Sequence, residues 1–141
     1  VHVYGAVSPL TGRTHYRIRP TLSKGHFADF LKQLSRYDRD KKILLIHDRA
    51  PHHRGRAIDE VVKATEGSLM LMPQPRYSPE FNPQERIWKW LRRVVTHDHG
   101  FESLSEELQA IRDFFCYVSG RKAEVRQLCT IKTPESLVAL L

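Results

Sequence analysis

Two acidic residues lie at positions where a predicted strand and a predicted helix can hold their carboxylates rigidly. Asp48 comes at the carboxyl end of an apolar run, residues 43–46, and Glu85 lies in the first turn of a predicted helix. Carboxylate oxygens suit Mg²⁺, which usually takes one or two of them together with water and phosphate oxygens. Two such ions can activate a water molecule and stabilise the leaving oxygen of a phosphodiester. The two acids therefore predict a shared metal site.

Both acids also have a local structural explanation. An aspartate after a strand commonly takes a turn or cap role. Asn82 and Glu85, with Pro83 at the first helical position, make a variant of the N-terminal capping box. The spacing alone leaves the metal site and these local roles open.

Basic side chains gather in three segments, and they define candidate contacts to a polyanion. The clusters are Arg13, Arg17 and Arg19; Arg49, His52, His53, Arg54 and Arg56; and Arg86, Lys89, Arg92 and Arg93. The formal net charge of +7, from 23 Lys and Arg against 16 Asp and Glu, favours nucleic acid as the partner. Exposed cations contact phosphates without reading bases, although ordinary solvated faces explain the outer two clusters equally well. Trp88 and Trp90 border an apolar stripe, which favours packing over base stacking.

The elements that must position these residues alternate between strands and helices. Residues 1–7 and 14–19 alternate about a turn at residues 8–12 and predict a β-hairpin. Apolar residues at helical spacing over 27–34 predict a helix that packs on it. Residues 43–46 are apolar on both faces, as expected of a central parallel strand covered on both sides.

The second half of the chain is predicted to be mainly helical. A helix about Ile58 precedes a short strand, residues 69–72, that prolines end. The helix that carries Glu85 has one apolar stripe, formed by Ile87, Trp90, Leu91, Val94 and Val95. A long helix begins at a capping box formed by Ser103 and Glu106, and a short terminal helix begins at residues 133–135.

Composition excludes several classes of protein. The 141 residues suit one domain, and 28% charged and 40% hydrophobic residues without a long apolar run fit neither disorder nor a membrane span. Two cysteines exclude a disulfide framework and a four-thiolate zinc site, so a reducing, intracellular (cytoplasmic) setting is expected. The histidine pairs that suggest zinc, His52 with His53 and His97 with His99, lack matching thiolates. No phosphate loop or acyl-transfer nucleophile motif occurs.

Two segments resemble a known family. Residues 48–53, DRAPHH, resemble the D-N-A-P-x-H segment, and residues 77–88, YSPEFNPQERIW, resemble the Y-[SA]-P-[DE]-[LF]-N-P-[IQV]-E-x-x-W segment, of insertion-sequence DDE transposases related to mariner elements. The hairpin is similar too, so the likeness reaches about His97. It implies an RNase H-like α/β core, whose mixed sheet starts with an antiparallel hairpin, continues with parallel strands and is flanked by helices.

The resemblance also implies roles for particular residues. In such transposases three acids bind two Mg²⁺ or Mn²⁺ ions for DNA strand cleavage and joining. Asp48 matches the second acid and Glu85 the third. His53 matches a histidine that would touch the substrate phosphate, and Asn82 would cap the helix that carries Glu85. Contacts to double-stranded DNA, the transposon ends and the target, are expected from the basic clusters, and specifically from Arg49, His52, Arg54, Arg56, Lys89, Arg92 and Arg93.

The chain departs from the family pattern in two places. The first acid is expected on a strand before the hairpin, and none of Asp29, Asp38 or Asp40 lies in an equivalent strand. We therefore expect residues 1–141 to be a single, N-terminally truncated catalytic domain with a C-terminal helical part over 101–141. Arg49 stands where the family usually has Asn, and the sequence leaves open whether Arg49 pairs with Asp48 or holds a phosphate.

The function expected from these observations is that of a transposase catalytic fragment, inactive or very weak alone. An alternative is an inactive DNA-binding or assembly module derived from a transposase, and a third is a related nuclease acting on RNA or in repair. A sheet without its first strand would expose hydrogen-bonding groups, which permits a strand-exchanged homodimer. No membrane partner is expected.

Overall fold

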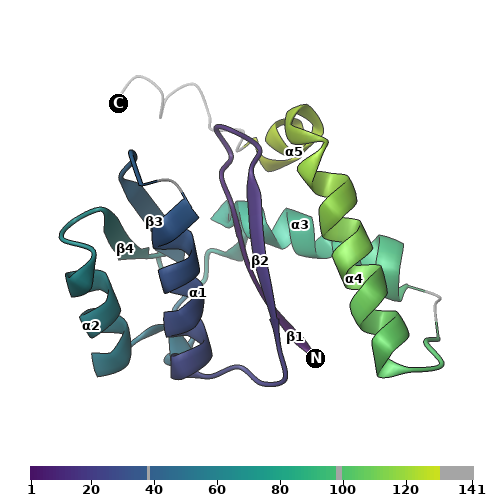
Figure 1. Ribbon diagram of the computed structural model, residues 1–141. Helices are drawn as coiled ribbons and strands as arrows, with labels where there is room; N and C mark the ends of the chain where they lie inside the picture. Colours follow the sequence, from purple (N-terminus) through teal and green to yellow (C-terminus); the bar gives the residue numbers. More distant parts are fainter. Residues whose placement is uncertain (38, 98–99, 131–141) are drawn as a thin grey trace. The chain divides into compact units, whose positions relative to one another are not determined.

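The computed structural model describes residues 1–37, 39–97 and 100–130 of the chain. Asp38, His99 and the terminal helix predicted at residues 133–135 lie outside this range. The elements, in chain order, are β1 His2–Val7, β2 Thr14–Arg19, α1 Lys24–Tyr37, β3 Ile43–His47, the 3₁₀ turn η1 Pro51–His53, α2 Arg56–Ala64, β4 Leu69–Pro73, the 3₁₀ turn η2 Pro79–Phe81, α3 Pro83–Leu91, the π-helical segment η3 Arg92–Thr96, α4 Leu104–Ser119 and α5 Lys122–Cys129 (Figure 1).

These elements form two compact units. The first contains Val1–Ala6 and His15–Asn82, and the second contains Val7–Thr14 and Pro83–Leu141. The mixture of strands and helices confirms the predicted α/β class. In the described part of the chain, no helix is long and apolar enough to span a bilayer.

The core of the first unit lies between the helices α1 and α2 and the strands β3 and β4. The two strands are parallel, with Ile43 opposite Leu69 at one end and His47 opposite Pro73 at the other. Helix α1 buries the predicted apolar face, and the buried cluster contains Phe27, Phe30, Leu31, Leu34, Ile58 and Leu69. Alternate side chains of the strands, including Ile43 and Leu71, pack against this cluster. The helical prediction for residues 27–34 is confirmed.

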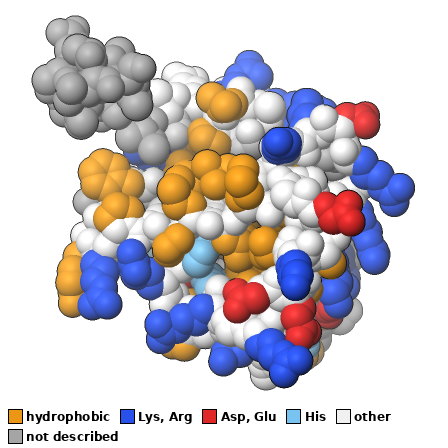
Figure 2. Space-filling view, turned by 90° about the vertical axis from the view of Figure 1, so that its left-hand side faces the viewer, with side chains coloured by type: hydrophobic (Ala, Val, Ile, Leu, Met, Phe, Trp, Pro, Cys, Tyr) orange, Lys and Arg blue, Asp and Glu red, His pale blue; other side chains and the backbone are white. Residues whose placement is uncertain are grey.

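The opposite face of β3 and β4 is exposed in the first unit. The register places Leu44 beside Met70 and Ile46 beside Met72, and these four side chains are between 43% and 51% exposed. Figure 2 views the side of the molecule on which α2 and β4 lie and shows hydrophobic side chains grouped in the open. The prediction that β3 is covered on both faces is therefore wrong for the described residues. The reason is that α1 and α2 both pack on the same face.

The sheet also differs from the single mixed sheet expected. Among the described residues, hydrogen bonds join β1 with β2 and β3 with β4, so the strands form two separate two-stranded sheets. The predicted hairpin is confirmed, with a turn in which Gly12 N–H donates to the Ser8 carbonyl at 2.8 Å. The single sheet fails because none of the described strands pairs with both the hairpin and β3.

The second unit packs the helices α3, α4 and α5 around a common core. Its buried side chains include Ile87, Leu91, Val95, Ile111, Phe114, Phe115, Val118 and Val125. Helix α4 begins at the predicted cap, where Ser103 Oγ accepts the Glu106 N–H at 3.2 Å. At Gly12 a side chain would meet the Lys122 carbonyl oxygen at 2.1 Å, so the turn over residues 8–12 requires glycine to lie this close to the start of α5.

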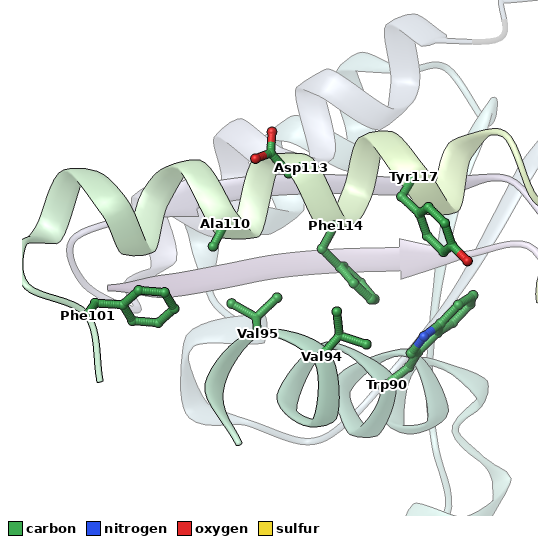
Figure 3. A pocket seen from close by; sticks show the side chains of 8 residues that line it. All are labelled: Trp90, Val94, Val95, Phe101, Ala110, Asp113, Phe114 and Tyr117. Carbon is green, nitrogen blue, oxygen red and sulfur yellow. The ribbon is translucent and has the colours of Figure 1, made fainter. Parts of the chain in front are cut away.

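The apolar stripe of α3 does not continue as predicted. After Leu91 the helix widens into the π-helical segment η3, which adds a residue to the turn and rotates the side chains that follow. Val95 is buried, whereas Val94 is 50% exposed and lines an open groove between α3 and α4 (Figure 3). The prediction that Val94 belongs to the buried stripe is therefore wrong.

Candidate active site at the end of strand β3

Asp48 is the first residue after β3, and a tight turn organises its carboxylate. Its Oδ1 accepts the backbone N–H of Ala50 at 3.0 Å, which is the geometry of an Asx turn. The η1 turn then reverses the chain, with His53 N–H donating to the Ala50 carbonyl at 2.9 Å. This reversal brings the His53 ring back to the acid, and His53 Nδ1–H donates to Asp48 Oδ1 at 2.6 Å. The local turn role and the pairing of the two predicted residues are therefore parts of one structure.

The surroundings of His53 fix its ring. The side chain is only 14% exposed, and its ring centroid lies 4.2 Å from that of Phe27, a buried residue of α1. On another side the ring of His52 lies 4.2 Å away, and His52 in turn contacts Tyr4 edge-on. The Asp48 side chain, by contrast, is 57% exposed. A held imidazole thus orients a carboxylate that solvent and ligands can reach.

The electrostatics of this turn keep Asp48 ionised. The hydrogen bond from His53 is the main cause that lowers the pKa of Asp48 to about 2, against partial burial that acts in the opposite direction. The Ala50 N–H and the charges of His53 and His52 add to the lowering. Burial lowers the pKa of His52 as well. At neutral pH Asp48 is therefore a carboxylate, which is the form that binds a cation.

The pairing of Asp48 with His53 should also stabilise the fold over a defined pH range. Because the folded-state pKa of Asp48 lies near 2, below the ordinary 3.8, this stabilisation is present above about pH 4 and is lost as the pH falls toward 2. Solvent screening of the exposed carboxylate limits it to about 1 kcal/mol. We expect Asp48→Asn to lower the free energy of unfolding by up to that amount at neutral pH. In urea denaturation the difference from the parent should shrink in acid, and a constant difference would contradict this account.

His47 belongs to the same cluster, although the motifs did not single it out. Its Nδ1–H donates to the Asp48 backbone carbonyl at 2.6 Å, and its ring lies 5.7 Å from that of His53. Burial lowers the pKa of His47, so the neutral ring is favoured. The sequence signal that could have identified His47 is its place as the last residue of β3, directly before Asp48.

Arg49 ties the ends of the two parallel strands together. Its Nε–H donates to the Gln74 carbonyl at 2.7 Å, and the Gln74 N–H donates to the His47 carbonyl at 2.8 Å. Gln74 is buried, and Arg49 reaches its carbonyl from the surface. The sequence left open whether Arg49 pairs with Asp48 or holds a phosphate. In the structure Arg49 binds the backbone carbonyl of Gln74, just beyond β4, which neither alternative anticipated. The bridge holds the loop after β3 in place, and with it Asp48.

Glu85 lies in the first turn of α3, within the second unit. Pro83 is the first residue of the helix, as predicted, and Asn82 immediately precedes it. Two contacts from α5 anchor this helix start. Cys129 Sγ–H donates to the Pro83 carbonyl at 3.8 Å, and Arg86 Nη1–H donates to the Leu128 carbonyl at 2.8 Å. Glu85 is half-buried beside these anchored residues.

The predicted DNA-contacting residues are distributed over both units. Arg49, Arg54 and Arg56 are exposed in the first unit, and Arg56 Nε–H also donates to Glu60 at 2.8 Å. His52 is half-buried. Lys89, Arg92 and Arg93 are all exposed along α3 and η3 in the second unit. Each cation is thus available on the surface of its own unit.

The donor chemistry fits the expected metal. Asp48 uses Oδ1 for both of its side-chain hydrogen bonds, so Oδ2 is open to a hard cation, and Glu85 offers another carboxylate. Asp48 is described within the first unit and Glu85 within the second. Among the described residues, no three of the side chains His, Cys, Asp or Glu gather closely enough to hold a metal ion.

Comparison with known proteins places the chain in a wider context. Residues 1–108 match the family described as "DDE superfamily endonuclease". The "uncharacterized 39 kDa protein" of insertion element IS630 from Shigella sonnei is 31% identical over 119 residues, which cover 84% of this chain and 34% of that protein. The chain therefore spans about a third of the length of this curated relative.

A solved structure shares the fold. The crystal structure of the catalytic domain of Mos1 mariner transposase superposes with a TM-score of 0.59 at 14% sequence identity. The superposition covers 83% of this chain and 64% of that chain. Both conserve the general arrangement of strands and helices, so the likeness is one of fold.

Proposed function

The chain belongs to the DDE superfamily of endonucleases, and from this membership we propose that it supplies a transposase catalytic centre in which Asp48 and Glu85 hold divalent cations. The observation that carries the proposal is the turn at residues 48–53. There an ionised, exposed carboxylate is oriented by a half-enclosed histidine, within the matched residues 1–108. An ordinary turn has no need of such a pair.

The proposed roles follow from the local geometry. Asp48 offers Oδ2 to a cation while His53 holds Oδ1, and Glu85 adds an oxygen donor from the anchored start of α3. When bound there, Mg²⁺ or Mn²⁺ would supply activation of a water molecule or a DNA 3′-hydroxyl and stabilisation of the leaving oxygen. Arg49 keeps Asp48 in position through Gln74.

The proposed substrate is double-stranded DNA, namely the transposon ends and the target. The reaction is hydrolysis of a phosphodiester followed by joining of the freed 3′ end to target DNA. The chain carries two of the three acids that the family resemblance implies, so we propose that alone it cleaves DNA weakly or not at all. Addition of an upstream strand that carries the implied first acid should then raise the rate of cleavage.

The experiment that tests this function is a nicking assay on supercoiled plasmid carrying the element's ends. The chain extended upstream by the implied strand should convert the plasmid to the nicked form with Mg²⁺ or Mn²⁺, and not with EDTA. Duplex binding without any metal-dependent nicking by the extended chain would favour the alternative, an inactive DNA-binding or assembly module.

Duplex binding itself should be steeply dependent on salt. Each phosphate contact releases counterions, so the logarithm of the binding constant falls linearly with the logarithm of the salt concentration, by about 0.9 per contact. We expect Arg54→Ala to reduce this slope by about 0.9, because Arg54 is exposed and directly follows His53, the partner of Asp48. Arg36→Ala removes an exposed cation from α1 of the same unit and serves as the matched control. Equal slopes for the two variants, measured by fluorescence anisotropy, would remove Arg54 from the DNA interface.

A further inference from the structure

One face of α3 and η3 forms a small basic cavity with α5 in the second unit. Arg86, Lys89 and Trp90 follow the spacing i, i+3 and i+4 on α3, so they lie along one side of the helix, and Arg93 of η3 lines the same cavity. Together with Glu124 and Leu128 of α5 they line a cavity of about 310 Å³. That side of α3 lies apart from the buried stripe of Ile87 and Leu91.

The charges of this cavity favour an anion. Three cations face one acid, and Glu124 already pairs with Arg121 at 3.5 Å. Arg86 is committed to the Leu128 carbonyl, whereas Lys89 and Arg93 are exposed and carry no ion pair within the described part of the chain. Two exposed cations beside one held by a hydrogen bond can together contact and neutralise a phosphate.

Trp90 gives the same cavity an aromatic wall. Its ring is held edge-on by Phe114, at a centroid distance of 5.6 Å, and by Tyr117, at 6.2 Å. Figure 3 shows Trp90 at one end of the apolar groove between α3 and α4, with its ring directed toward Tyr117. The side chain is only half-buried and lines both the groove and the basic cavity. Packing therefore fixes the ring and leaves part of it available, so packing and stacking need not exclude each other here.

We propose that this cavity holds one nucleotide of a DNA strand, with its phosphate between Lys89 and Arg93 and its base against Trp90 and Leu128. The proposal deepens the proposed function, because it names the part of the DNA that the second unit binds. A duplex keeps its bases stacked inside, so the nucleotide must be unpaired or displaced from the stack. A phosphate contact alone would leave the apolar wall unused.

The test measures binding of short single strands in EDTA, where no cleavage occurs. Trp88→Phe leaves Trp90 as the one tryptophan, because the chain contains two. An oligothymidylate should quench its fluorescence, and an abasic strand of equal length should bind about tenfold more weakly because base stacking is lost. Anisotropy of a labelled oligothymidylate with the unaltered chain gives the same comparison without the Trp88 substitution. Equal affinity for the two strands in both measurements would overturn the proposal.

Substitution of the two exposed cations locates the site. Lys89→Ala combined with Arg93→Ala should weaken oligothymidylate binding by about tenfold or more. The matched control, Arg112→Ala, removes an exposed cation from α4 of the same unit and should change affinity by about twofold at most. An effect no larger than that of the control would place the strand elsewhere.

The result of these binding measurements does not depend on the nuclease proposal. Binding is measured in EDTA, so the metal that the nuclease proposal requires is absent, and every residue that lines the cavity belongs to the second unit. Failure of cleavage with intact base-dependent binding would refute the proposed function alone. Cleavage without base-dependent binding would refute the cavity alone.

Discussion

Asp48→Asn and Glu85→Gln are each expected to lower metal-dependent DNA cleavage by about a thousandfold or more. Both substitutions keep the shape of the side chain and remove the negative charge that attracts a cation. Cations at such a centre contribute several kcal/mol to transition-state stabilisation, and each 1.36 kcal/mol corresponds to a tenfold change in rate. The loss should appear at every pH at which the parent is active, because an amide does not ionise.

The measurement is the rate of plasmid nicking by the extended chain, with Mg²⁺ and then with Mn²⁺. Asp59→Asn, on α2 of the first unit, and Glu107→Gln, on α4 of the second, make the same chemical change at positions away from the proposed centre. These controls should retain the parental rate within about twofold. If Asp48→Asn or Glu85→Gln cleaves as fast as its control, that residue does not bind the cation.

His53→Ala is expected to have the second largest effect, a loss of about ten- to a hundredfold in metal affinity or cleavage rate. Side chains that orient a metal-binding group typically contribute that much. The loss should arise because the Asp48 carboxylate is no longer held in one orientation. With a pKa near 2 in the parent and an ordinary value of 3.8, Asp48 is ionised at neutral pH either way. If His53 acted only by lowering the pKa of Asp48, His53→Ala would therefore leave the cleavage rate at neutral pH unchanged.

The pH profile separates these two effects of His53. In His53→Ala the acidic limit of cation binding by Asp48 should move upward from about pH 2 toward 3.8, while the loss at neutral pH remains. His53→Asn keeps an N–H donor and should recover part of the rate. His2→Ala, which removes an exposed histidine of β1 in the same unit, is the control. Parental activity of His53→Ala at neutral pH would assign the histidine a purely structural role.

The features that could be predicted from the sequence are those written in local patterns. The apolar spacing over residues 27–34 places one helix face in the core whatever lies opposite, because the hydrophobic effect depends on buried area and not on direction. The cap at Ser103 needs only the three residues that follow it. The pairing of Asp48 with His53 is local as well, since the proline-containing turn of residues 48–53 closes it, but it was not predicted from the sequence.

Other features were decided only by the tertiary structure. They depend on contacts between residues distant in sequence, or on backbone groups, which every residue type carries. Arg49 binds the carbonyl of Gln74, and any residue type would offer that acceptor, so the pattern could not reveal it. An apolar run such as residues 43–46 reports that the side chains avoid water, but not how many layers cover them, and Leu44 and Ile46 prove to be exposed. Likewise Val94 fits the helical spacing, and that spacing contains no sign of the π-helical segment that leaves Val94 half exposed. The sequence by itself thus determined the family and the buried face of α1, because short-range spacing encodes them. The bridge behind Asp48, the open strand face and the basic cavity beside Trp90 depended on which surfaces meet when the chain folds.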